Sequence, residues 1–171
     1  MTRSQSGFTL FEVILSITLL SSIVFTSVVF FGAVLSSRAK TNATQEVHDA
    51  ARIASAFITK RIRSAASIES ASSTFGAHPG VLTLAMDDPS LDPTILSVSP
   101  DSDLQITEGN SSPVSLTSNR VTITNLVFTE TSYPGSGGGI GIDLTIAYRN
   151  PGGDPNYDYS QRYNSFVLLR P

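Results

Sequence analysis

The residue with the clearest chemical signal is Glu12, which is the only ionisable side chain between Phe8 and Leu35. The other residues of this run are apolar, glycine, or carry a hydroxyl group. An unpaired charge at the centre of a bilayer costs about 2.5 kcal/mol or more, so an acid in an apolar helix is a functional residue by default. We expect Glu12 either to pair with a positive charge or to extend to the membrane surface.

A second group of polar residues has the spacing of metal ligands. Asp154, Asn156 and Asp158 alternate like the first ligands of a calcium loop. However, Tyr159 stands where an EF-hand loop has glycine, and Ser165 stands where it has the bidentate glutamate. Calcium is the one cofactor that this spacing suggests, and the alternative is that the aspartates and the asparagine form turns.

Other reactive groups are sparse, which argues against an enzyme. The chain contains no cysteine, so it has no disulfide framework, thiolate metal site or cysteine nucleophile. His48 falls in a helical segment and His78 in a turn, and neither has an evident partner in the sequence. The glycines at 135–141 fit no phosphate-binding spacing. We therefore predict a non-catalytic protein.

Charge is distributed unevenly along the chain. The net charge is −3, but the chain from Ala71 onwards has ten acidic and four basic residues. Between Arg38 and Ser70 there are six basic and three acidic residues. A phosphate-binding surface needs positive charge, so the acidic C-terminal part argues against nucleic acid as a partner.

The apolar run predicts a membrane-spanning helix, because residues 8–35 are long enough to cross a hydrocarbon core of about 30 Å. A secretory signal peptide would have a shorter apolar region followed by a small-residue cleavage site. Here a short polar leader, Met1–Gly7, precedes the run, and Arg3 is its only charge. Hydroxyl groups at four-residue spacing, those of Thr18, Ser22 and Thr26, can bond to carbonyls one turn earlier and so enter lipid.

The sequence Gly7-Phe8-Thr9-Leu10-Phe11-Glu12, followed by the apolar run, resembles the processing site of type IV prepilins and type II secretion pseudopilins. Four features coincide: a short leader, a glycine, then a phenylalanine, and a glutamate at a fixed offset heading an apolar helix. The resemblance implies cleavage after Gly7 by a prepilin peptidase, N-methylation of Phe8 and retention of the helix. It also implies that Glu12 directs assembly by approaching the Phe8 amine of another subunit.

The resemblance further implies the partners and the location of the protein. The partners are then other pilin or pseudopilin subunits, the prepilin peptidase, the membrane, and a pilus or secretion assembly platform. The chain crosses the cytoplasmic (inner) membrane once, with its head on the outer or periplasmic side, and then joins a periplasmic or extracellular filament. Many major pilins have a proline in the apolar segment and this chain has none, which favours a minor pilin or a pseudopilin. The alternative is a plain membrane anchor.

Beyond the apolar run the sequence predicts an amphipathic helix and then strands. Apolar residues fall within about 140° of a helix circumference: Val47, Ala50, Ala51, Ala54, Phe57, Ile58, Ile62, Ala65 and Ile68. Charged residues cluster on the opposite side: Asp49, Arg52, Lys60 and Arg63. After Ser70 turn residues become dense, and we expect strands at 81–86, 95–98, 104–107, 114–117, 121–129, 140–148 and 165–169.

The expected fold is α+β, with a long N-terminal membrane-spanning helix packed on an antiparallel β-sheet head, similar to that of pilins. The expected organisation is a leader, a transmembrane or filament-core helix, and a head made of an amphipathic helix and a β-sheet. The corresponding residues are 1–7, 8–37 and 38–171, with the helix of the head at 38–70 and the sheet at 80–171.

Two functions are compatible with this fold and with the resemblance to prepilins. The leading one is a structural subunit of a type IV pilus or a type II secretion pseudopilus, assembled through its N-terminal helix. The alternative is a recognition or adhesion module displayed on a filament, which binds a surface, a cargo protein or DNA through the loops of the head. The glycine-rich loop at 135–141 is the candidate contact for the alternative.

Overall fold

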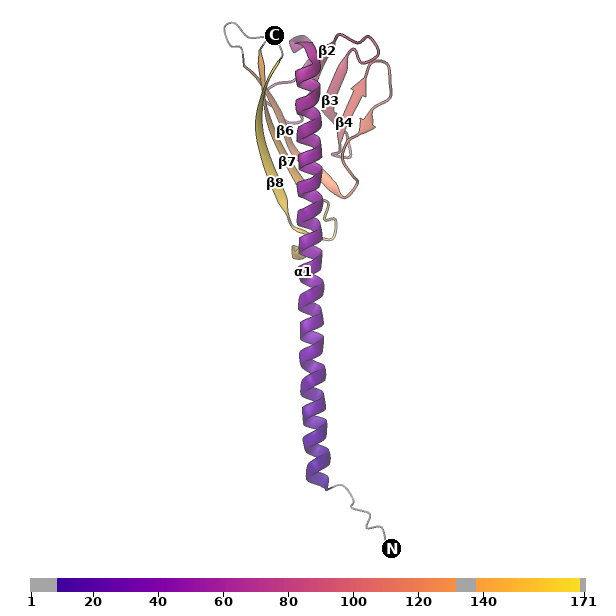
Figure 1. Ribbon diagram of the computed structural model, residues 1–171, viewed down its shortest axis with the longest axis vertical. Helices are drawn as coiled ribbons and strands as arrows, with labels where there is room; N and C mark the ends of the chain where they lie inside the picture. The colour runs from indigo at the N-terminus through magenta and orange to yellow at the C-terminus, as the bar shows by residue number, and fades with distance from the viewer. Residues whose placement is uncertain (1–8, 132–137, 170–171) are drawn as a thin grey trace. The chain divides into compact units, whose positions relative to one another are not determined.

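The computed structural model describes residues 9–131 and 138–169. The chain divides into two compact units, Met1–Ala39 and Lys40–Pro171. One long helix, α1 (Leu10–Ser64), begins in the first unit and ends in the second, and the strands follow it in the second unit (Figure 1). The chain therefore has the expected α+β arrangement of a long apolar N-terminal helix followed by antiparallel strands.

Helix α1 passes through the apolar segment without interruption, since residues 10–35 contain no proline. The hydroxyl groups bond back along the helix as predicted: Thr18 Oγ1 donates to the Ile14 carbonyl at 2.8 Å, and Thr26 Oγ1 donates to the Ser22 carbonyl at 2.8 Å. The apolar segment is long enough to cross a membrane, because 26 helical residues extend for about 39 Å.

The part of α1 in the second unit buries one face. Its fully buried residues recur at steps of three and four, as expected for a helix with a single apolar stripe: Ala43, Val47, Ala51, Ala54, Ile58 and Ile62. The charged residues predicted on the opposite side, from Asp49 to Arg63, are exposed. The amphipathic interpretation is confirmed for these turns.

The helix ends six residues before the predicted end at Ser70. It stops at Ser64, and β1 (Ala65–Ile68) pairs antiparallel with β2 (Leu82–Met86). Ala65 and Ile68 continue the helical spacing of the apolar stripe, and this misled the prediction. Pairing with β2 supplies their backbone hydrogen bonds instead, across a register irregularity that follows Ala65.

The strands form two antiparallel sheets rather than the single one expected. The first has the order β1-β2-β3-β4-β5, and the second has the order β6-β7-β8. The remaining elements are β3 (Thr94–Val98), β4 (Leu104–Glu108), β5 (Val114–Ser115), β6 (Val121–Thr131), β7 (Gly139–Tyr148), β8 (Ser160–Leu168) and the 3-10 turns η1 (Ser70–Ser72) and η2 (Pro155–Tyr157). Each predicted strand corresponds to one of these, although β8 begins five residues before its predicted start.

Strands β6 and β7 alternate between buried and accessible residues, as their sequence patterns predict. The buried residues of β7 are Ile140, Ile142, Leu144 and Ile146, and those of β6 are Val121, Ile123, Leu126 and Phe128. The step of three between Ile123 and Leu126 coincides with a register shift before Asn125. This β-bulge moves the alternation by one residue and returns the apolar side chains to the core.

A single hydrophobic core joins α1 to both sheets, because buried residues of all three layers belong to one contact cluster. In the second unit, β6, β7 and β8 lie on one side of the helix and β2, β3 and β4 on the other (Figure 1). Ion pairs add to this packing. Arg61 on α1 pairs with Glu108 on β4, and Arg149 pairs with Asp103 at 2.9 Å between the two sheets. The helix thus holds together two sheets that do not share a strand.

Candidate functional site

Glu12 lies in the first turn of α1, and its side chain is exposed. It makes no ion pair with any residue that the structure describes. The predicted cleavage residues, Gly7 and Phe8, lie outside the described residues. The N-terminal end of a helix carries a partial positive charge, so a carboxylate in the first turn is favoured even without a counter-ion.

Thr9 caps this helix, a role that our sequence analysis missed. The N–H of Glu12 donates to Thr9 Oγ1 at 3.3 Å and to the Thr9 carbonyl at 3.1 Å. These contacts form one half of a capping box, for which the pattern Thr9-Leu10-Phe11-Glu12 is the sequence signal. The backbone of Glu12 therefore helps to start the helix, and this role is separate from any role of its side chain in assembly.

The apolar part of α1 offers its whole circumference for contact. Every residue from Thr9 to Ala33 is exposed, and the exposed fraction of the large hydrophobic side chains ranges from 43% at Val13 to 80% at Leu10. The described part of the chain contains one helix long and apolar enough to cross a membrane, and it is this one. A helix that is apolar on all sides needs an apolar environment, either lipid or other helices.

The calcium candidates lie in a turn before β8. Asp154 caps η2: its Oδ1 accepts from the Asn156 backbone N–H at 2.9 Å and from Asn156 Nδ2 at 3.0 Å. Asp158 follows the same turn, and no three His, Cys, Asp or Glu side chains in the described ranges are grouped to hold a metal ion. The turn-forming role is thus observed for Asp154, and calcium binding stays a prediction.

Both histidines have partners, contrary to the sequence analysis. His48 on α1 lies between two phenols: its Nε2 is 2.9 Å from the Tyr159 hydroxyl, and its Nδ1 is 3.3 Å from the Tyr163 hydroxyl. His78 Nδ1 accepts from the Leu126 N–H at 3.0 Å. These partners lie from 48 to 115 positions away in the sequence, which is why inspection of the neighbouring residues did not reveal them. Their contacts connect α1 to β8 and the turn at His78 to β6.

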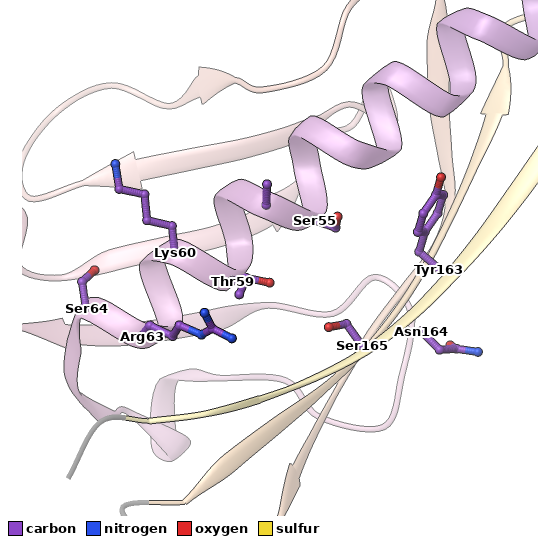
Figure 2. Close-up of a pocket in the computed structure, with 9 residues that line it drawn as sticks. Ser55, Thr59, Lys60, Arg63, Ser64, Tyr163, Asn164 and Ser165 are labelled. Carbon is purple, nitrogen blue, oxygen red and sulfur yellow. The ribbon is translucent and has the colours of Figure 1, made fainter.

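A groove that the sequence did not reveal lies between α1 and β8 and has a volume of about 680 Å³. On the α1 side it is lined by Lys60 and Arg63 together with smaller side chains, and on the β8 side by residues 163–165 (Figure 2). The predicted contact loop at 135–141 lies elsewhere in the chain. Its residues 135–137 are outside the described residues, and Gly139 begins β7.

Comparisons of this chain with protein-family models, with curated proteins and with solved structures gave no match. The resemblance to prepilins therefore rests on the residues from Gly7 to Glu12 and on the helix that follows them.

Proposed function

We propose that this protein is a structural subunit of a type IV pilus or a type II secretion pseudopilus, either a minor pilin or a pseudopilin. A prepilin peptidase cleaves it after Gly7, Phe8 becomes N-methylated, and the stem helix enters the filament. The observation that carries the proposal is the combination of the Gly7-Phe8 pair with a fully exposed apolar helix whose first turn holds a lone carboxylate, that of Glu12.

Electrostatics explain the pairing that the proposal requires. Cleavage creates a positively charged amine beside an apolar helix, and Glu12 is the only acid within the apolar segment. Each charge makes the other tolerable in a medium of low dielectric constant, and breaking such a pair leaves an uncompensated charge. Pairing between subunits would therefore fix the axial register of neighbouring stem helices.

Processing is tested by the N-terminal mass of the protein isolated from membranes of cells with and without a prepilin peptidase. We expect a chain that begins with methylated Phe8 only when the peptidase is present. An intact Met1 in both strains, or a cut well beyond Leu35, would overturn the proposal.

Assembly is tested separately with Glu12→Gln, which keeps a side chain suited to the capping box but removes the charge. We expect normal membrane insertion and processing, with loss of the protein from sheared or purified filaments. The matched control is Asp49→Asn, which neutralises an exposed carboxylate elsewhere on α1. If Glu12→Gln assembles as well as the wild type, the negative charge of Glu12 has no role in assembly.

A further inference from the structure

Strand β8 is the end strand of its sheet, and its backbone groups alternate in direction. The Tyr148 N–H donates to the Tyr159 carbonyl at 2.9 Å, and the Leu169 N–H donates to the Gly138 carbonyl at 3.1 Å. In an antiparallel ladder, hydrogen-bonded pairs alternate with pairs whose N–H and C=O groups point away from each other. The register between β7 and β8 therefore turns the backbone groups of Asn164 outward, away from β7.

The opposite edge of the same sheet is covered by another segment of the chain. The Gly76 N–H donates to the Phe128 carbonyl of β6 at 2.9 Å, and the Gly80 N–H donates to the Leu126 carbonyl at 2.8 Å. At the outer edge of β8, the structure shows for Asn164 no backbone bond to any described residue. An uncovered edge is a template for an additional strand.

The groove beside this edge exists because the side chains that meet there are short. Positions of β8 that face the core alternate, and Val167 is buried, with 1% of its surface exposed. Ser165, two residues earlier on the same face, is exposed. Ser165 together with Ser55 and Ala56 on α1 cannot fill the space between helix and strand. The result is an open groove beside the outward backbone groups of Asn164.

The groove carries positive charge that no described residue neutralises. Arg61 pairs with Glu108, and Arg162 pairs with Asp143, but Arg63 and Lys60 form no ion pair within residues 9–131 and 138–169. Figure 2 shows the Arg63 guanidinium extending from α1 toward the part of β8 that holds Ser165, whereas the side chain of Lys60, which also lines the groove, extends away from β8. An anionic ligand is therefore favoured here over a neutral or cationic one.

We propose that the edge of β8 and the adjoining groove bind an extended acidic segment of a partner protein. The segment adds to β8 as a further strand and bonds to the outward N–H and C=O of Asn164. Because alternate side chains of a strand point to the same face, carboxylates two residues apart reach the groove and pair with Arg63 and Lys60. This interaction goes beyond the proposed role in filament assembly, because it needs neither processing at Gly7 nor the stem helix.

The charge requirement is tested by fluorescence anisotropy with the full-length protein in nonionic detergent. The probe is a fluorescein-labelled nonapeptide of alternating aspartate and valine. We expect Lys60→Gln/Arg63→Gln to weaken binding about tenfold, because two charge-assisted contacts are lost. Arg38→Gln/Lys40→Gln removes the same charge from exposed positions of the same helix and serves as the matched control. Equal weakening in both double variants would overturn the specific site.

The strand requirement is tested at Asn164. Asn164→Pro removes an N–H that points away from β7, so the sheet is retained while the partner strand loses a donor. Asn164→Ala removes only the side chain. We expect the proline variant to bind at least fivefold more weakly than the alanine variant, with unchanged circular dichroism. Equal binding by the two variants would overturn strand addition, and an unfolded proline variant would leave the decision to the charge variants.

Two further measurements decide between classes of partner. A single-stranded DNA oligonucleotide should bind more weakly than the acidic peptide, and its binding should be the same for the two Asn164 variants. Binding of DNA at least as tight as that of the peptide would replace the proposal with a general polyanion site.

Sedimentation of the wild type and of Lys60→Gln/Arg63→Gln should give the same oligomeric state. A change of state would mean that the occupant is a second copy of the chain.

Discussion

The ion pair between Arg61 and Glu108 gives the sharpest test of how α1 is fastened to the five-stranded sheet. Arg61 lies over the Phe57 ring, with its guanidinium carbon 5.1 Å from the ring centroid. The side chains of Arg61 and Glu108 retain only 21% and 26% of their exposure. Arg61 Nη2 contacts Glu108 Oε1, but the buried Arg61 Nε makes no hydrogen bond to the residues that the structure describes. The pair is thus held by charge with incomplete hydrogen bonding.

The partial burial of this ion pair determines how much free energy of unfolding each variant should lose. Removing one partner of a fully buried pair costs about 3–5 kcal/mol, because the remaining charge is left uncompensated. The residual exposure of both side chains screens that charge, so we expect about 1–2 kcal/mol for Arg61→Met or Glu108→Leu alone. The double variant removes both charges and keeps most of the packing, so its stability should lie within about 0.5 kcal/mol of the wild type.

The assay is thermal and urea unfolding of the full-length protein in nonionic detergent, followed by circular dichroism at a wavelength sensitive to the strands. Each single variant should lower Tm by about 4–6 °C, and the double variant should recover most of that loss. The control is Arg52→Met, which removes an exposed charge from the same helix and should change the stability little. The reasoning is refuted if the double variant loses the sum of the two single effects.

Three further predictions concern the second unit, and each is checked by unfolding measurements. His48→Phe should cost about 1 kcal/mol, because it removes the imidazole contacts with two phenolic hydroxyls. The hydrogen bond from Arg162 holds the pKa of Asp143 below its usual value, so the stability that this pair contributes is present above about pH 4 and is lost as the pH falls through the lowered pKa. Asp143→Asn should therefore flatten the acid side of the pH profile slightly, and an unchanged profile would contradict this. Gly139→Ala would place a Cβ against the far end of the Phe166 ring, and because this ring is 48% exposed it can turn aside, so the cost should be about 1 kcal/mol or less, whereas Gly152→Ala meets nothing within 4 Å and should be nearly neutral.

Local patterns were sufficient to predict most elements of the second unit. The four isoleucine and leucine residues from Ile140 to Ile146 alternate strictly, and such alternation has one physical solution, a strand with one buried face. The stripe from Val47 to Ile62 likewise has one solution, a helix with one buried face. The pattern failed at Ala65 and Ile68, because a few apolar residues at helical spacing are equally compatible with a short strand.

Features that depend on distant pairing were not predictable from one sequence. The division into two sheets depends on which strands pair. Bonds between the sheets depend equally on distant residues: the carbonyl of Ser102, a residue with a positive φ of 63°, accepts from the Ile123 N–H at 2.7 Å. The groove at Ser165 arises because small side chains of α1 lie opposite this small side chain of β8. A sequence does not show which residues of the helix and the strand lie opposite each other. The two tyrosines that contact His48 were likewise not predictable, because they lie more than a hundred positions away in the sequence.

The apolar N-terminal part of α1 and its later, amphipathic part need different surroundings, and this follows from the size of the hydrophobic effect. Sixteen large hydrophobic side chains between Leu10 and Leu35 are exposed, and covering them would gain on the order of 20 kcal/mol. That gain is at least as large as the roughly 5–15 kcal/mol by which a typical domain is stable, so it strongly drives the segment out of water. The helix therefore requires lipid or neighbouring helices, whereas the segment from Ala43 to Ile62 is already covered by the sheets.

This difference predicts that the two interaction surfaces of α1 are separable by mutation. Glu12→Leu should abolish incorporation into filaments and leave binding of the acidic peptide unchanged, because the groove is built entirely from residues of the second unit. Lys60→Gln/Arg63→Gln should weaken peptide binding about tenfold and leave peptidase processing unchanged. The two measurements are anisotropy with the detergent-solubilised protein and the N-terminal mass of the membrane form. If Glu12→Leu weakened peptide binding, the stem and the groove would be coupled, and the conclusion that the two parts of the helix act independently would be wrong.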